Sequence, residues 1–158
     1  MIPIRYILGD ATDPIGYGHK IIAHIVNSAG GWGRGFVLPL AKRYPPAEVS
    51  YREWHANKSG FVLGNVQFVD VGEGVTVANM LAQQGYGRAY GLPPIRYVEL
   101  QECLVKVRER ALAMNATVHA PRFGSGLAGG QWALIADMIK DELSSHDVAV
   151  FIYDLPGK

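Results

Sequence analysis

The segment P-R-F-G-S-G-L-A-G-G at residues 121–130 constrains the fold of this chain more than any other stretch. It lies between an apolar run that ends at Ala120 and an amphipathic run that begins at Gln131. A glycine-rich turn between a strand and a helix allows backbone amides to face an anion. The segment therefore predicts a strand, a loop and a helix in succession, with an anion site at the loop.

A second glycine-rich loop precedes it in the chain. The run I-I-A-H-I-V at residues 21–26 is β-branched and almost wholly apolar, as expected of a strand that is buried on both faces. It ends at Asn27, and S-A-G-G-W-G-R-G follows at residues 28–35. Two such loops in one small domain can hold a diphosphate from two sides.

Composition limits the class of protein. With 158 residues the chain can bury one good core, so we expect a single domain over residues 1–158. The net charge of +1 argues against a general nucleic-acid-binding surface. No apolar run approaches the roughly 20 residues of a membrane span, the N-terminus does not resemble a signal peptide, and the single Cys103 suits a reducing compartment. We therefore expect a cytoplasmic protein without membrane contact.

The periodicity of apolar residues predicts an alternation of strands and helices. The expected strands are residues 4–8, 21–26, 65–71, 75–81, 117–120 and 148–153. The strands at 65–71 and 75–81 are expected to form a hairpin around residues 72–74. The expected helices are residues 36–44, 95–114 and 132–143, with one or two helical turns at 51–59. A long loop at 83–94 is typical of a lid or binding loop. This order predicts an α/β fold with helices on both faces of one sheet and ligands at the carboxyl ends of its strands.

Residues 124–129 also match G-x-G-x-x-G, the dinucleotide-binding fingerprint. The match follows a strand and precedes a helix, and Asp154 ends the next strand. However, a Rossmann domain opens with its fingerprint, whereas here only one strand remains after it. A redox enzyme is therefore disfavoured. The glycines either serve an anion site or simply turn the chain.

The order of the motifs resembles the macro domain family nearly from end to end. The matching features are Gly9-Asp10, a strand that ends in Asn27, the loop at 28–35, and P-R-F-G-S-G-L-A-G-G-Q-W before a last helix and strand. The chain looks closest to the branch that holds the terminal ADP-ribose protein glycohydrolase and the yeast ADP-ribose-1″-phosphate phosphatase. That branch has the pattern H-x-x-N-x-x-G-x-W-G-x-G, which is close to His24, Asn27, Gly30 or Gly31, Trp32, Gly33 and Gly35 here.

The resemblance implies a three-layer α/β/α sandwich with a central mixed sheet that binds ADP-ribose at the ends of its strands. Asp10 would accept a hydrogen bond from the adenine amino group, with the Ala11 backbone beside it, and Leu155 would pack on the adenine. From the residues alone, capping a turn is the favoured role of Asp10. Asn27 would reach the hydroxyls of the distal ribose, whereas His24 is either a core residue or a catalyst.

The diphosphate would lie between backbone amides of the two loops. The first loop would contribute Gly33, Arg34, Gly35 and Phe36. The second loop would contribute Gly124, Ser125, Gly126 and Leu127. The resemblance implies no metal and no cofactor.

Two departures from the family pattern concern catalysis. The glycohydrolase type uses a lysine after the middle strand and an aspartate after G-x-G-L, where this chain has Gln83-Gln84 and Ala128. An amide cannot form a Schiff base, so a lysine adduct is excluded. We expect Asn27 and Gln84 to act as the catalytic residues by orienting the reacting centre and a water held by the substrate's own phosphate.

The expected function is hydrolysis of ADP-ribosyl linkages on proteins by a stand-alone domain of bacterial type, with ADP-ribose and ADP-ribosylated proteins as partners. Two alternatives remain open. The chain is either a non-catalytic reader of ADP-ribose, as the two departures suggest, or an ADP-ribose-1″-phosphate phosphatase, as the pattern from His24 to Trp32 suggests.

Overall fold

The computed structural model describes residues 1–85, 94–126 and 128–157. The strands in these ranges are β1 (Arg5–Leu8), β2 (Lys20–Asn27), β3 (Val66–Gly72), β4 (Val75–Gln83), β5 (Thr117–Ala120) and β6 (Val150–Asp154). The helices are α1 (Val37–Arg43), α2 (Pro45–Asn57), α3 (Tyr97–Met114) and α4 (Trp132–Glu142), and a short 3₁₀ turn, Ser144–His146, follows α4. Among these described helices, none has the length and apolar character needed to cross a membrane.

One mixed sheet contains the six strands in the order β1-β6-β5-β2-β4-β3. The pairs are parallel except for β3 and β4, which pair antiparallel and confirm the predicted hairpin. Five strands therefore run in the same direction. As a result, the carboxyl ends of β1, β6, β5, β2 and β4 meet at one edge of the sheet.

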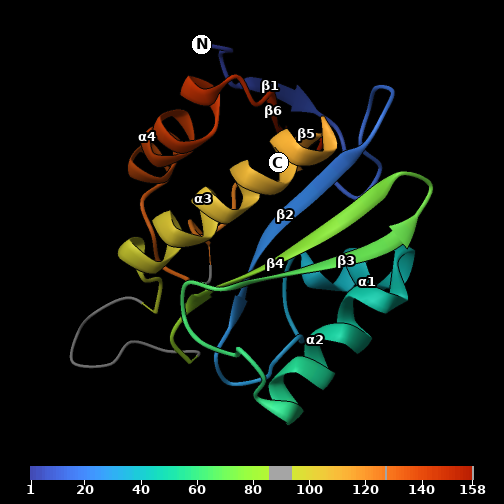
Figure 1. Cartoon of the computed structure of the whole chain (residues 1–158), viewed down its shortest axis with the longest axis vertical. Coiled ribbons are helices and arrows are strands. Elements are labelled where there is room, and N and C mark those ends of the chain that lie inside the picture. The colour runs from blue at the N-terminus through green and yellow to red at the C-terminus, as the bar shows by residue number, and fades with distance from the viewer. Residues whose placement is uncertain (86–93, 127, 158) are drawn as a thin grey trace.

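Helices cover both faces of this sheet (Figure 1). The side chains of β2 alternate between two apolar clusters. Ile21 packs in the cluster that includes residues of α3 and α4, whereas Ile22 packs in the cluster that includes residues of α1 and α2. This confirms the predicted three-layer α/β/α sandwich, and it confirms that the apolar run of β2 is buried on both faces.

The second helix is longer than the sequence predicted. Pro45 and Pro46 end α1, as expected, but they also occupy the first two positions of α2. Proline is favoured there because its missing N–H has no partner in the first turn of a helix. The polar stretch expected to form only one or two turns is the second half of this 13-residue helix.

The third helix begins later than the sequence predicted. Ile95 was expected to open it, with Pro94 at its start, but α3 begins at Tyr97. Ile95 instead forms an antiparallel bridge with Gln83, and its N–H donates to the carbonyl oxygen of Ala128 at 3.1 Å. Ile95 therefore ties the end of β4 to the second glycine-rich loop.

A buried histidine fastens β5 to β6 and to the loop after β1. The ring nitrogens of His119 lie 2.7 Å from the Thr117 hydroxyl and 2.7 Å from the Tyr153 hydroxyl. The Tyr153 oxygen also accepts the Ile15 N–H at 3.0 Å, so its own hydrogen is free to point at His119. Burial, and secondarily the charge of Lys20, lower the pKa of His119 to about 4.

This histidine predicts acid sensitivity. Its pKa in the folded protein lies below the usual value of 6.5, so the unfolded chain binds more protons between pH 6.5 and pH 4. The free energy of unfolding should therefore fall as the pH is lowered through that window, by about 3 kcal/mol from His119. Urea unfolding of wild type and His119→Gln at several pH values measures this. An equally steep fall in the variant would contradict the prediction.

Candidate functional site

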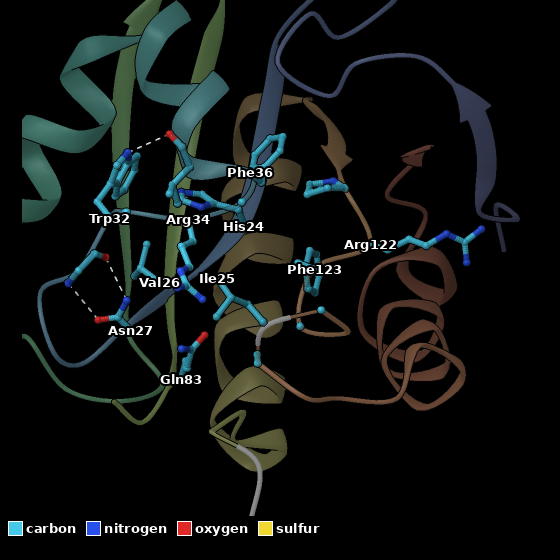
Figure 2. Close-up of a pocket in the computed structure, with 18 of the residues that line it drawn as sticks. His24, Ile25, Val26, Asn27, Trp32, Arg34, Phe36, Gln83, Arg122 and Phe123 are labelled. Carbon is cyan, nitrogen blue, oxygen red and sulfur yellow. Dashed lines mark hydrogen bonds between the residues drawn. The ribbon is translucent and has the colours of Figure 1, made fainter. Parts of the chain in front are cut away.

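A cleft with a volume of about 770 Å³ opens at the carboxyl ends of β2 and β5. One wall is the glycine-rich loop after β2, which continues into α1, and the other is the loop after β5 (Figure 2). The two loops that the sequence singled out thus face each other across one cleft. This arrangement follows from the sheet order, because β2 and β5 are parallel neighbours.

The structure brings together one group of the residues that the sequence nominated. Those lining the cleft are Asn27, Gly33, Arg34, Gly35, Phe36, Gly124 and Gly126. Those not among its lining residues are Asp10, Ala11, Gln84, Ser125 and Leu155. Leu127 and residues 86–93 of the predicted 83–94 loop lie outside the described residues.

The nominated adenine residues lie at the ends of β1 and β6. One oxygen of Asp10, Oδ1, accepts hydrogen bonds from the backbone N–H of Thr12 at 2.9 Å and from its hydroxyl at 2.8 Å. The Asp10 carboxylate therefore caps a turn, the role that the residues alone favoured. Ala11 is buried, Leu155 is 49% exposed, and Tyr153 is buried in the core.

The side chain of Asn27 makes most of its hydrogen bonds to the backbone of the loop that follows it. Its Oδ1 accepts the backbone N–H groups of Ala29 at 3.0 Å and Gly31 at 3.1 Å, and its Nδ2 donates to the Gly31 carbonyl at 3.0 Å (Figure 2). The Tyr51 hydroxyl donates to the Asn27 carbonyl oxygen. An amide nitrogen has two hydrogens, so one N–H of Asn27 remains for a ligand. Its first role is to hold the loop, which sequence reasoning did not foresee.

Gln83 occupies the position in the cleft that the sequence analysis gave to Gln84. Gln83 is the last residue of β4, pairs in register with Asn27, and lines the cleft. Gln84 is exposed and its N–H donates to the Pro94 carbonyl. The difference of one residue arises because side chains alternate along a strand, and β4 extends two residues beyond its predicted end at Leu81.

His24 is held neutral at the wall of the cleft. Its ring packs edge-on against Trp32, with the ring centroids 5.3 Å apart, and against Phe36 at 5.9 Å. The amide nitrogen of Asn79 donates to the Gln67 side chain, so the Asn79 oxygen is the acceptor of the His24 Nε2–H. Burial lowers the pKa of His24 to about 4, against a smaller opposite effect of the Asn79 hydrogen bond.

Nδ1 of His24 is buried and has no hydrogen-bond partner in the described part of the chain. The sequence left His24 open as a core residue or a catalyst; the structure buries it in the core at 2% exposed, at a point where it also lines the cleft. The partners Asn79 and Gln67 were missed. A polar residue inside the apolar run of β4 was the available signal.

The charged side chains among the described lining residues of the cleft are all basic. Arg34, Arg52 and Arg122 line it, and no aspartate or glutamate is among its described lining residues. Arg52 pairs with Glu48 at 2.8 Å and Arg122 pairs with Asp154 at 2.7 Å. The described residues also contain no cluster of histidine, cysteine or acidic side chains arranged to hold a metal ion. Such a cleft favours an anionic ligand.

The glycines of the second loop differ in what they do. A Cβ on Gly124 would lie 2.6 Å from Ile95 Cδ1 and 2.9 Å from Ile135 Cδ1, and its φ of +78° is unfavourable for other residues. A Cβ on Gly126 would meet no atom of the described residues within 4 Å, and its φ is not in the left-handed region. Gly124 is therefore required for packing, whereas Gly126 keeps open space in the cleft.

Comparisons with solved structures give close full-length matches. A protein of Bacteroides thetaiotaomicron, solved as one of unknown function, is 50% identical and covers 98% of this chain and 99% of its own, with a TM-score of 0.96. The macrodomain protein from Streptomyces coelicolor is 44% identical, covers 96% of this chain and 99% of its own, and has a TM-score of 0.86. Thermosipho africanus DarTG, solved in complex with ADP-ribose, is 16% identical with a TM-score of 0.69; it covers 87% of this chain and 38% of its own, a likeness of fold alone.

Curated proteins also match. The chromodomain-helicase-DNA-binding protein 1-like of Danio rerio is 31% identical over 95% of this chain, but the chain spans only 15% of that protein. The ADP-ribose 1″-phosphate phosphatase of Lodderomyces elongisporus is 26% identical over 96% of this chain and 99% of its own length. No family model matches the chain.

The two glycines predict opposite outcomes for the same substitution. Gly124→Ala should lower the free energy of unfolding by about 3 kcal/mol, because it forces a contact in the core and strains a left-handed backbone. Gly126→Ala is the matched control and should change stability by less than about 0.5 kcal/mol. Denaturant unfolding of the pair tests this, and equal losses would refute the distinction.

Proposed function

This chain belongs to the macro domain family, and on that basis we propose that it binds ADP-ribose in the cleft and hydrolyses ADP-ribosyl linkages to protein side chains. The observation that carries the binding proposal is the cleft itself. Two glycine-rich loops face each other across it, and three arginines but no described carboxylate line it. A diphosphate matches that charge and the backbone amides of the loops.

The order of the strands supports an order of subsites. The nominated adenine residues, Asp10 and Leu155, lie at the ends of β1 and β6, at one side of the sheet. The two loops follow β5 and β2 in the middle, where the diphosphate would lie. Asn27 and Gln83 lie at the ends of β2 and β4, so the distal ribose would lie at that far end of the cleft.

The residues of the cleft favour water attack assisted by the substrate. Among the described lining side chains only His24 could act as a general base, but burial lowers its pKa to about 4 and covers its Nδ1. The sequence of 86–93, Y-G-R-A-Y-G-L-P, and Leu127 add no carboxylate, lysine or histidine. A phosphate oxygen of the ligand would therefore take the proton as the water oxygen bonds to C1″ of the distal ribose. The bond from C1″ to the acceptor oxygen breaks, and the acceptor leaves with that bonding pair.

In this mechanism the protein contributes positioning and electrostatics. The loops hold the diphosphate, the remaining N–H of Asn27 contacts the ribose, and Gln83 rather than Gln84 orients the reacting centre. Asn27 therefore keeps a part in the site, although mainly through the loop that it fixes.

A reader of ADP-ribose without catalysis is the alternative that the cleft also supports. Ala128 and Gln83 stand where a carboxylate and a lysine act in the glycohydrolase type, and both line the cleft. A phosphatase for ADP-ribose 1″-phosphate is the other alternative, supported by the full-length likeness to the Lodderomyces enzyme. Phosphate release from that compound by wild type and by His24→Ala distinguishes the phosphatase.

The binding site is tested at Gly126, where a side chain fits without disturbing the fold. Gly126→Glu places a carboxylate in the cleft, and Gly126→Gln places a neutral group of the same size there. We expect the Glu variant to bind ADP-ribose on the order of a hundredfold more weakly than the Gln variant. Calorimetry measures both, with the thermal midpoints as a control for folding. Equal affinities of wild type and the Glu variant would overturn the site.

Hydrolysis is tested by incubation with an ADP-ribosylated acceptor protein. We expect wild type to release ADP-ribose, and Gly126→Glu to release it far more slowly than wild type and Gly126→Gln under subsaturating substrate, because the added carboxylate repels the diphosphate. If the ADP-ribose label stays on the acceptor protein while wild type still binds free ADP-ribose, the hydrolase proposal is refuted. The alternative of a non-catalytic ADP-ribose-binding module then remains.

A further inference from the structure

The three arginines that line the cleft differ in their partners. Arg52 is held by Glu48 and by the carbonyl oxygen of Gly30. Arg122 makes two hydrogen bonds to Asp154, at 2.7 Å and 3.0 Å, and its guanidinium lies over the rings of Tyr6 and Trp132. Arg34 is the exception, since it has no hydrogen-bond or ion-pair partner within residues 1–85, 94–126 and 128–157.

The directions of the side chains differ as well. In Figure 2 the Arg122 side chain points away from the cleft, toward β1, whereas the Arg34 side chain points along the cleft past Val26 toward Gln83. Gln83 and Asn27 mark the end of the cleft formed by β2 and β4. The unpaired guanidinium is therefore directed at the end where the proposed function puts the distal ribose.

We propose that Arg34 is a specificity residue whose guanidinium pairs with an oxyanion carried at C1″ of the distal ribose. This inference rests on the proposed binding of ADP-ribose and specifies the group at C1″: either a phosphate, or an acceptor carboxylate that gains its charge as its bond to C1″ breaks. A guanidinium binds carboxylate and phosphate oxygens through two parallel N–H groups. No described acidic side chain in the lining competes for it. A cationic group at C1″ would be repelled by the same residue.

An ion pair between Arg34 and a group at C1″ of the distal ribose affects the affinity for that group, not the affinity for the diphosphate. ADP-ribose itself has a neutral hydroxyl at C1″, so it lacks the oxyanion that would pair with the Arg34 guanidinium at this position. A ligand with a phosphate or a carboxylate there gains a charge-assisted pair with the exposed Arg34, which corresponds to about tenfold in affinity when the pair is bidentate. Both sources share the oxyanion, and the experiment separates them.

The experiment uses ADP-ribose and two analogues that cannot be hydrolysed, one with a phosphonomethyl and one with a carboxymethyl group at C1″. Calorimetry measures their affinities for wild type, Arg34→Gln and the control Arg5→Gln, which removes the same charge from strand β1 outside the cleft lining. We expect wild type and the control to prefer at least one analogue about tenfold over ADP-ribose. Arg34→Gln should lose this preference, because its affinity for the favoured analogue should fall about tenfold more than its affinity for ADP-ribose.

The analogue that gains affinity identifies the oxyanion as phosphate, carboxylate or both. The inference is overturned if wild type prefers neither analogue, or if Arg34→Gln weakens all three ligands by the same factor, since Arg34 would then contact the diphosphate. If wild type fails to bind ADP-ribose at all, the proposed function falls and this inference falls with it. Binding of ADP-ribose without discrimination removes the inference alone.

Discussion

The central strand β2 and the way it ends determine the geometry of the cleft. β2 lies between β5 and β4 and is buried on both faces, so the strand has little freedom to shift relative to its neighbours. At its end, Asn27 turns the chain by accepting the N–H groups of Ala29 and Gly31, and the Tyr51 hydroxyl holds its carbonyl. An amide that binds its own loop in this way replaces hydrogen bonds that the loop would otherwise lose on leaving the sheet. The conformation of the first wall of the cleft therefore depends mainly on the side chain of Asn27.

The second wall is fixed by packing. A Cβ on Gly124 would press on the methyl ends of Ile95 and Ile135 and would strain a backbone with φ of +78°, and the Gly130 N–H donates to the Gly124 carbonyl at 2.7 Å. Gly126 has no such contact and leaves the cleft open. Rigid walls with free space between them suit a ligand that is bound by backbone amides, because the donors are in place before it arrives. Glu48 and Asp154 offset much of the charge of Arg52 and Arg122, so Arg34 is the lining arginine whose charge no described carboxylate balances.

Much of the fold could be predicted because its signals are local. The strand over 117–120 agrees with β5, and the spacing of Ile135 and Ile139 marks the buried face of α4. The errors occurred where a local signal had two meanings. Pro45 and Pro46 end one helix and begin the next, and Ile95 looked like the start of a helix but pairs with Gln83. The bridge of Ile95 forms because the end of β4 lies beside it in the folded protein, and the residues next to Ile95 in the sequence do not indicate this.

The sequence by itself determined the two glycine-rich loops, the order of strands and helices, and the candidate residues Asn27, Gly124 and Gly126, because backbone turns and periodicity depend on neighbours in the chain. The tertiary structure decided that Gln83 rather than Gln84 faces the cleft, that Asn79 holds His24, and that Arg34 has no partner among the residues that the structure describes. These features depend on strand register and on contacts between residues far apart in the chain. A shift of one residue moves a side chain to the opposite face, and local patterns do not specify it.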